Sequence, residues 1–406
     1  MYWLTLLAAC TDKAASPAGD DSGGTTTPST TGPCASGGWG PFTDPETVIT
    51  VATSGGDATS VADGLALADP AHPNVLITEG EWTTRLDLRA GDQDGITLAG
   101  CSATGSVLVA PDAENYIVRV DGALGVRLDS LTLRGGRRAL WLEAPAEVTL
   151  SALSVQESAR VGILVLGAAT VVMTDVEVSD VQAEAVSFGM VGYGMSVDGS
   201  PTASASISME GACFRGSTGV GVLAQSADLT IVDSVIEDTL PDTSSGTALF
   251  GRGIQLQSYS TLDLQGSALT GNADAAIFSV GTLSLTVTDS EVRSTSAAAT
   301  VAGGAVETGD GIVAIQGSDT TGRDVADFMV SLDGVTIDGN ERAAVVLEDV
   351  TMVSATDVSG SNGFSVDGKP IVAQGAADVS AVPDLAGTPK TPLLLNLTSV
   401  PPDAGA

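Results

Sequence analysis

The segment VSLDGVTIDGN runs from Val330 to Asn340. The segments LDLQGSALTGN, which begins at Leu262, and LTVTDSEVRST, which begins at Leu285, repeat its order of apolar and turn-forming residues. Apolar and polar side chains alternate in all three, which is the period of a strand with one buried face. A chain that repeats one such unit predicts a fold built from stacked copies of it.

The first apolar position of the unit is aliphatic in all nine copies that we align. These anchor residues are Ile96, Val126, Val148, Val171, Ile207, Leu229, Leu262, Leu285 and Val330. The shortest interval between two anchors is 22–23 residues, and the longer intervals add insertions to that unit. A single unit cannot bury its apolar face, whereas stacked units can, so the repeat predicts a solenoid.

A small or acidic residue stands four positions after each anchor, where the alternation slips by one residue. These residues are Gly100, Ser130, Ala152, Asp175, Gly211, Asp233, Gly266, Asp289 and Gly334. Glycine and aspartate tolerate a left-handed backbone, so we expect a bend at this position. A second bend follows nine to ten residues after the anchor. We therefore interpret these aspartates as turn formers rather than as a catalytic or calcium-binding ladder.

The repeat resembles that of the right-handed parallel β-helices of the pectin-lyase-like superfamily, from residue 48 to about residue 375. The resemblance implies an all-β solenoid of about nine to ten coils of 22–23 residues with insertions. The β-helix would occupy residues 41–375, with an N-terminal cap at 48–95, and residues 376–406 would form a C-terminal cap and a disordered tail. A sandwich of irregular hairpins is the alternative, but its strands would not keep these columns in register.

The chain is acidic, with a formal net charge of −34. Its lysines are Lys13, Lys369 and Lys390. Such a surface repels nucleic acid and anionic lipid, so we expect no nucleic-acid partner. Solubility in salty surroundings explains the charge without a ligand, and we expect no metal site and no cofactor. Calcium binding to the acidic surface is the alternative.

The N-terminal residues MYWLTLLAAC end in Leu7-Ala8-Ala9-Cys10, which resembles the lipobox of bacterial lipoproteins. The resemblance implies that residues 1–9 are a signal peptide, that Cys10 is lipidated, and that the protein belongs to the cell envelope as an outer-membrane lipoprotein or on the extracellular surface. Residues 10–40 are rich in Ser, Thr, Gly and Pro, as in a flexible tether. An ordinary frayed terminus is the alternative.

Three cysteines remain after Cys10, namely Cys34, Cys101 and Cys213. An odd number cannot pair completely within one chain, so an exported protein would form at most one bridge among them. A bridge between Cys34 and Cys101 is one possibility, but the sequence leaves the pairing open.

The insertions follow the second bend in several coils. They span residues 182–193, 240–251 and 296–310, with a further insertion at 318–328. Because the bends stack, we expect these loops to form a wall along one edge, which is where repeat proteins build binding surfaces. Tolerated decoration of the loops is the alternative.

Arginines gather near the N-terminal end of the repeat. By column, Arg119 and Trp141 should point outward from neighbouring coils, with Arg127 and Arg138 close by. A guanidinium beside an indole suits an acidic sugar, so we predict that these four residues bind ligand. Pairing of these arginines with the surplus acids is the alternative.

The superfamily includes polysaccharide lyases and glycoside hydrolases, whose chemistry needs grouped acids. The candidate acids here are Asp310, Asp324 and Asp327, around the longest insertion. Since no Asp-Asp or Asp-x-Asp pattern lies on the central strands, we expect a non-catalytic, lipid-anchored, monomeric cell-surface protein. It would bind extracellular polysaccharide or a partner surface. The alternative is a polysaccharide lyase or glycoside hydrolase acting on acidic polysaccharide.

Overall fold

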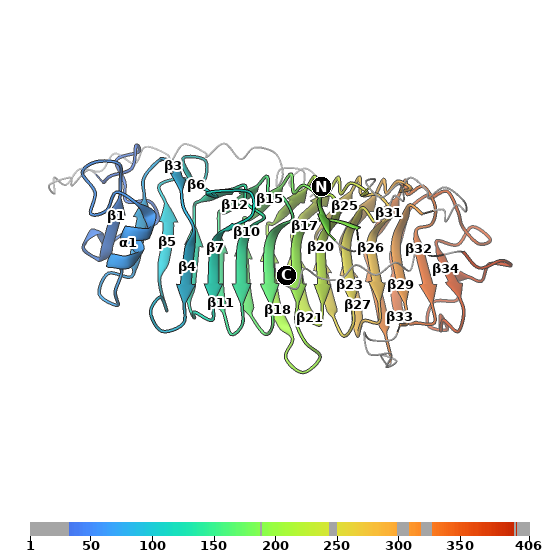
Figure 1. Cartoon of the computed structure of the whole chain (residues 1–406). Coiled ribbons are helices and arrows are strands. Elements are labelled where there is room, and N and C mark those ends of the chain that lie inside the picture. The colour runs from blue at the N-terminus through green and yellow to red at the C-terminus, as the bar shows by residue number, and fades with distance from the viewer. Residues whose placement is uncertain are drawn as a thin grey trace, which may run out of the picture.

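The computed structural model describes residues 32–186, 189–242, 250–298, 308–317, 327–393 and 395. Each coil of the chain adds one strand to each of three long parallel sheets. The rod in Figure 1 therefore grows coil by coil, from α1 (Val61–Leu67) at one end to β34 (Ile371–Gln374) at the other. The fold is a right-handed parallel β-helix, which confirms the all-β solenoid predicted from the repeat.

Sheet 1 contains the anchor residues. Its strands in spatial order are β1 (Val48–Val51), β2 (Asn74–Ile77), β5 (Thr97–Gly100), β8 (Val126–Asp129), β11 (Glu147–Ser151), β14 (Thr170–Thr174), β18 (Ala205–Glu210), β21 (Ala227–Val232), β24 (Thr261–Gln265), β27 (Ser284–Thr288), β30 (Met329–Asp333) and β33 (Thr351–Thr356). Val148 pairs with Val126 on one side and Val171 on the other, so the aligned anchors are hydrogen-bonded neighbours.

Sheet 2 follows sheet 1 in the coils from β2 to β30 and has short strands. They are β3 (Gly80–Thr83), β6 (Ser106–Val109), β9 (Thr132–Arg134), β12 (Ser154–Gln156), β15 (Glu177–Ser179), β19 (Cys213–Arg215), β22 (Val235–Glu237), β25 (Ala268–Thr270), β28 (Glu291–Arg293) and β31 (Thr336–Asp338).

Sheet 3 completes each coil. Its strands, from the N-terminal end of the rod, are β4 (Leu86–Arg89), β7 (Tyr116–Asp121), β10 (Arg138–Glu143), β13 (Val161–Leu166), β17 (Gly189–Asp198), β20 (Gly219–Gln225), β23 (Arg252–Gln257), β26 (Ala275–Val280), β29 (Asp310–Ile315), β32 (Val345–Glu348), β34 and β35 (Ala386–Gly387). β16 (Glu184–Val186) lies beside this sheet and pairs antiparallel with β17.

One continuous apolar core fills the inside of the rod. Leu262 and Leu264 of β24 and Leu269 of β25 are buried, as the repeat predicts for its inner columns. Each pairs with an aliphatic residue one coil away, for example Leu264 with Val287. Because each strand is buried between two neighbours, the apolar columns hold the coils in register.

Separate elements cover the N-terminal end of the rod. Helix α1, which follows the short 3₁₀ turn η2 (Pro45–Thr47) and β1, starts at Ser60, whose side chain accepts a hydrogen bond from the Asp63 amide. Val61 and Leu65 of the helix are buried in the core. A disulfide joins Cys34 to Cys101, which resolves the pairing that the sequence left open. Cys213 is disulfide-bonded as well, so the expectation of at most one bridge is wrong. Cys10, where the sequence predicts a lipid, lies outside the described residues.

Within the described part of the chain, no helix is long and apolar enough to cross a membrane. At the C-terminal end, Val382 and Ala386 lie against the last coils and belong to the same core. The inner columns are thus covered at both ends, where a solenoid would otherwise expose strand edges.

Both predicted bends have a left-handed backbone. At the first bend, positive φ angles occur at Ser130, Ala152, Asp175, Gly211, Asp233, Gly266, Asp289 and Gly334. Gly100 differs, because it has no positive φ, but the space of a Cβ atom there is taken by the Ser130 carbonyl oxygen, 2.2 Å away. The turn-forming interpretation of the aspartates at this bend is therefore confirmed.

The alternation of aspartate and glycine at this bend has a steric cause. The Asp233 carboxylate leans over Gly266 of the next coil, and its Oδ1 atom would lie 2.5 Å from a Cβ atom at that glycine. Asp289 lies over Gly334 in the same way, also at 2.5 Å. An aspartate in one coil thus favours a glycine in the next.

We predict that Gly266→Ala destabilises the protein more than Gly135→Ala. Both glycines have positive φ, at 56° and 80°, but a Cβ atom at Gly135 has no neighbour within 4 Å. The backbone cost should be about 1–2 kcal/mol at both positions, and displacement of Asp233 should add about 1 kcal/mol at Gly266 only. Urea unfolding measures both losses. Equal losses, or a Gly266→Ala defect that Asp233→Ala does not reduce, would contradict the steric explanation.

Candidate functional site

The outer face of sheet 3 is bordered by the insertions. The segments from β15 to β17, from β22 to β23 and from β28 to β29 all carry the chain from sheet 2 to sheet 3, so they leave along one edge. These segments contain the insertions at 182–193, 240–251 and 296–310, parts of which lie outside the described residues. The insertion at 318–328 instead leaves sheet 3 along its other edge, between β29 and β30.

Arg119 and Trp141 lie side by side on this face, as their columns predict. Trp141 of β10 pairs with Arg119 of β7 in the parallel register. The Arg119 guanidinium carbon lies 4.9 Å from the centre of the indole, and that of Arg138 lies 5.1 Å from it. The ring of Tyr116 meets Trp141 edge to face, with centroids 5.7 Å apart. The indole is therefore a fixed wall of the site rather than an open stacking platform.

The four predicted ligand-binding residues do not form one group. Arg138 is buried beside Trp141, but Arg127 lies on β8 of sheet 1 and is ion-paired with Asp129. Since sheets 1 and 3 are different faces of the rod, the structure separates Arg127 from Arg119 and Trp141.

Arg119 is engaged by two carboxylates of its own chain. Its guanidinium bonds to Glu143, with Nε 2.8 Å from Oε2, and lies 3.4 Å from Asp121. Arg119 and Glu143 each keep about a quarter of their side chain exposed, at 27%. The pairing with surplus acids, which was the alternative for these arginines, therefore holds for Arg119.

The acids predicted around the longest insertion are not brought together. Asp310 is buried on β29, whereas Asp327 is exposed beyond the end of that strand, and Asp324 lies outside the described residues. The neighbour of Asp310 is instead Asp274, whose backbone oxygen accepts a hydrogen bond from the Asp310 amide.

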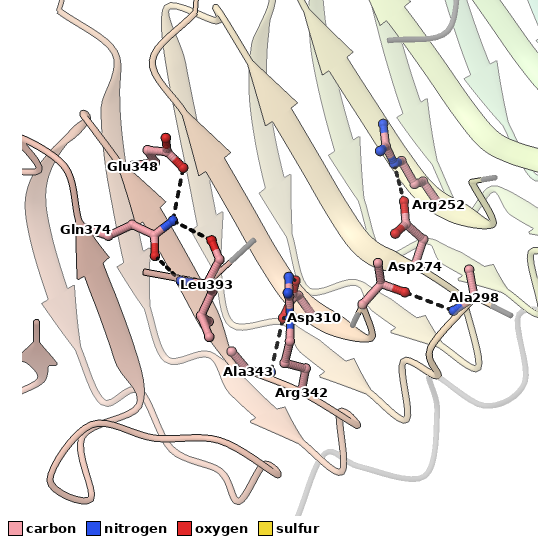
Figure 2. A network of polar contacts seen from close by, with 10 residues as sticks. Arg252, Asp274, Ala298, Asp310, Arg342, Ala343, Glu348, Gln374 and Leu393 are labelled. Atoms are coloured by element: carbon pink, nitrogen blue, oxygen red, sulfur yellow. Dashed lines mark hydrogen bonds and ion pairs between the residues drawn. The ribbon is translucent and has the colours of Figure 1, made fainter. Parts of the chain in front are cut away.

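Each of these two carboxylates is bound to a buried arginine (Figure 2). Arg252 donates to Asp274 at 2.6 Å, and Arg342 donates to Asp310 at 2.7 Å. Burial raises the pKa of Asp310 above the usual range, while its contact with Arg342 opposes that rise. A buried, perturbed carboxyl with a charged partner is a candidate for function, so access to it decides its role.

Residues of the C-terminal segment cover the Asp274 and Asp310 carboxylates. Gln374 accepts from the Leu393 amide at 2.9 Å and donates to the Leu393 carbonyl at 3.1 Å (Figure 2). Leu395 lines a cavity of about 10 Å³ together with Asp274, Asp310 and Arg342. Such a volume holds about one water molecule, so a sugar cannot reach these carboxylates in this conformation.

A second pair of carboxylates on the same face is accessible. Glu143 of β10 pairs with Leu166 of β13, and Leu166 pairs with Asp198 of β17. The two acids thus stand in one outward column with one strand between them. Two strand spacings separate their backbones by about 9–10 Å. The residue between them is the apolar Leu166, whose side chain is partly exposed.

Asp198 is the perturbed member of the accessible pair. Burial raises its pKa above the ordinary value for an aspartate. Its Oδ1 atom accepts a hydrogen bond from Gln225 of the neighbouring strand at 3.2 Å. The repeat does not predict this residue, because the insertion at 182–193 breaks the 22–23-residue spacing just before it.

The described residues contain no group of three or more His, Cys, Asp or Glu side chains that could hold a metal ion. The only histidine, His72, lies near the N-terminal end and bonds to Asp69.

We predict that Asp310→Ala lowers the free energy of unfolding by about 3–5 kcal/mol, because it leaves the Arg342 charge buried without this carboxylate. The double variant Asp310→Ala/Arg342→Met should recover most of the loss. Asp92→Ala, in an exposed turn, is the control and should change stability by no more than about 0.5 kcal/mol. Urea unfolding of the four proteins checks this, and an Asp310→Ala protein as stable as the control would contradict the buried pair.

Comparison with known proteins finds similarity only in three dimensions. No family model and no curated protein matches the chain. An alginate lyase from Paenibacillus sp. str. FPU-7 is similar at 14% identity and a TM-score of 0.46, over 82% of this chain and 99% of that chain. The catalytic domain of a GH87 alpha-1,3-glucanase is similar at 12% identity and a TM-score of 0.45, over 83% and 70%. Pectin methylesterase PemA from Erwinia chrysanthemi is similar at 12% identity and a TM-score of 0.34, over 84% and 92%.

The comparison corrects the function expected from the sequence. Each of these three proteins is an enzyme by name, as is the similar pectate lyase Pel9A. The expectation of a non-catalytic binding protein is therefore wrong on this finding, which favours the alternative of a polysaccharide-active enzyme. At these identities the likeness extends to the fold, so the reaction must be argued from the residues of this chain.

Proposed function

We propose that the protein is a glycoside hydrolase that binds a polysaccharide at the partly exposed edge of sheet 3 that carries Glu143 and Asp198. The observation that carries the proposal is the outward column in which Glu143 and Asp198 flank Leu166. Two strand spacings separate their backbones by about 9–10 Å, and the carboxyl groups of an acid and a base that admit a water molecule lie about 6.5–9.5 Å apart, which side chains on these backbones can reach.

Asp198 is the general acid in this proposal. Its raised pKa keeps a proton on the carboxyl at a higher pH than an ordinary aspartate would allow. The hydrogen bond from Gln225 occupies Oδ1, so Oδ2 is the oxygen that can present the proton to a glycosidic oxygen.

Glu143 is the general base. It is ion-paired with Arg119, which holds the carboxylate in place, and it remains partly exposed to water. Glu143 takes a proton from a water molecule as the water oxygen attacks the anomeric carbon. The bond from that carbon to the glycosidic oxygen breaks, and Asp198 protonates the departing oxygen, so that one water molecule is consumed for each bond cleaved.

The charges at the site favour a neutral polysaccharide over an acidic one. The guanidinium of Arg119 is already bound by Glu143 and Asp121. The chain as a whole carries a formal charge of −34, which repels a polyanion. The partly exposed, apolar Leu166 between the two acids suits the carbon face of a sugar ring.

The test is hydrolysis of a panel of neutral and acidic polysaccharides, read as new reducing ends and new unsaturated ends. We expect reducing ends from a neutral polymer, a loss of about 10²-fold or more in kcat for Asp198→Asn and for Glu143→Gln, and little change in KM. Asp228→Asn is the control, because this exposed acid lies on sheet 1. Full activity in both site variants, or unsaturated ends, would reject the proposed reaction.

The pH dependence should follow Asp198. Because the general acid must carry a proton, kcat/KM should fall as the pH rises through its raised pKa. Asp198→Asn should remove that alkaline limb from whatever activity remains. A profile with the same alkaline limb in the variant would assign the acid to another residue.

A further inference from the structure

A row of hydrogen-bonded side-chain amides, called the amide chain below, connects Asp198 to the buried Arg252. Gln225 Nε2 donates to Asp198 Oδ1 at 3.2 Å, and Gln257 Nε2 donates to Gln225 Oε1 at 3.2 Å. Gln255 Nε2 donates to Gln257 Oε1, again at 3.2 Å. The chain ends at Arg252, whose Nη1 donates to Gln255 Oε1 at 2.9 Å.

The groups at the two ends fix the direction of every amide. An arginine can only donate, so the atom of Gln255 that faces it must be the oxygen, and the Gln255 nitrogen must point onward. The same reasoning orients Gln257 and then Gln225. At the far end the Asp198 carboxyl oxygen accepts, which agrees with this orientation. Amide orientation, usually ambiguous, is here determined by chemistry.

Packing alone does not call for this chain. On the two adjacent strands, the residues that pair with Gln255 are Leu223 and Phe278. On the following strand, the residue that pairs with Gln257 is Val280. Apolar side chains therefore fit these columns, whereas buried amides and a buried ion pair are costly unless fully bonded. Arg252, Gln255 and Gln257 are 0%, 0% and 6% exposed.

We infer that Gln225, Gln257 and Gln255 are positioning residues that hold Oδ1 of Asp198 as an acceptor and leave its proton on Oδ2. They are anchored by the buried Arg252–Asp274 ion pair. This inference rests on the proposed role of Asp198 as general acid. Hydrogen bonds in series polarise one another at low dielectric, so the guanidinium strengthens the donor that Gln225 presents.

Few other charges act on Asp198. Its partners on the adjacent strands are Leu166 and Gln225, and the charged members of its column on the other side are Glu143 and, beyond it, Asp121. Arg119 bonds to both of those acids. Replacement of a glutamine in the amide chain should therefore change the pKa of Asp198 mainly through its hydrogen bond with Gln225.

The sign of the effect follows from the acceptor role of Oδ1. A donor bonded to a carboxylate favours the charged form, so weakening that donor should raise the pKa of Asp198 further. The carboxyl should also lose its fixed orientation, which lowers kcat without weakening substrate binding.

The experiment is a titration of the Asp198 carboxyl carbon by ¹³C NMR in the full chain, in which Asp198→Asn identifies the signal. Gln225→Met should move the midpoint upward by about one pH unit, and Gln257→Met and Gln255→Met should move it in the same direction by less. Gln265→Met is the control, because this exposed amide donates to Asp263 on sheet 1. Methionine keeps the approximate volume of glutamine. Two variants, Gln257→Met and Gln255→Met, test the inner part of the amide chain, so the test stands if one of them fails to fold.

The outcomes test the role of the three glutamines separately from the proposed hydrolase activity. A midpoint that moves for Gln225→Met but stays at the wild-type value for both inner variants would overturn the amide chain, even if Asp198→Asn abolishes hydrolysis. Midpoints that move in the expected order support the positioning of Asp198 by the three glutamines, even if Asp198→Asn leaves hydrolysis intact and the proposed function fails. In an active protein, the inner variants should also lower kcat by about tenfold with KM unchanged.

Discussion

The structure depends on the stacking of identical apolar positions in successive coils. Each inner aliphatic residue pairs in register with its counterparts above and below, as Leu264 does with Ile231 and Val287. A shift of one residue would turn the whole apolar column outward, so the buried face fixes the register of all three sheets at once. The residues on the outer faces take the register that the buried columns fix.

This constraint turns sequence spacing into spatial contact. Positions one coil apart lie one strand spacing apart, about 4.8 Å, whatever insertion separates them in the chain. Glu143 and Asp198 are brought into one column in this way, and so are Gln225 of β20 and Gln257 of β23. The insertions can therefore vary while the columns on the outer face keep their geometry, which is how a repeat scaffold supports a site.

The sequence predicts those parts of the molecule that repeat. The inner columns and the left-handed bends recur from coil to coil, and both are found where the pattern put them, with Gly100 as an exception among the bends. The pairing of Arg119 with Trp141 could also be predicted, because no insertion separates their coils from the aligned anchors. Arg127 was misjudged because it belongs to sheet 1, and its closeness in sequence hides the change of face.

Burial on the outer face could not be predicted from the repeat. Leu164, Ser196 and Gln255 point outward by column, yet each is 0% exposed, because other segments cover the middle of sheet 3. The contact of Leu393 with Gln374 is one such covering interaction between a non-repeating segment and the rod. Asp198 owes its raised pKa to the same kind of local burial, which has no periodic signature in the sequence.

The central claim is that Glu143 and Asp198 act as a base and an acid on opposite sides of a glycosidic bond, far enough apart to admit water. The most direct measurement is ¹H NMR of the anomeric proton in the first product formed from a cleaved polysaccharide. The two-strand separation of about 9–10 Å predicts a product of inverted anomeric configuration. A product of retained configuration would require carboxyls about 5 Å apart and would contradict the assignment.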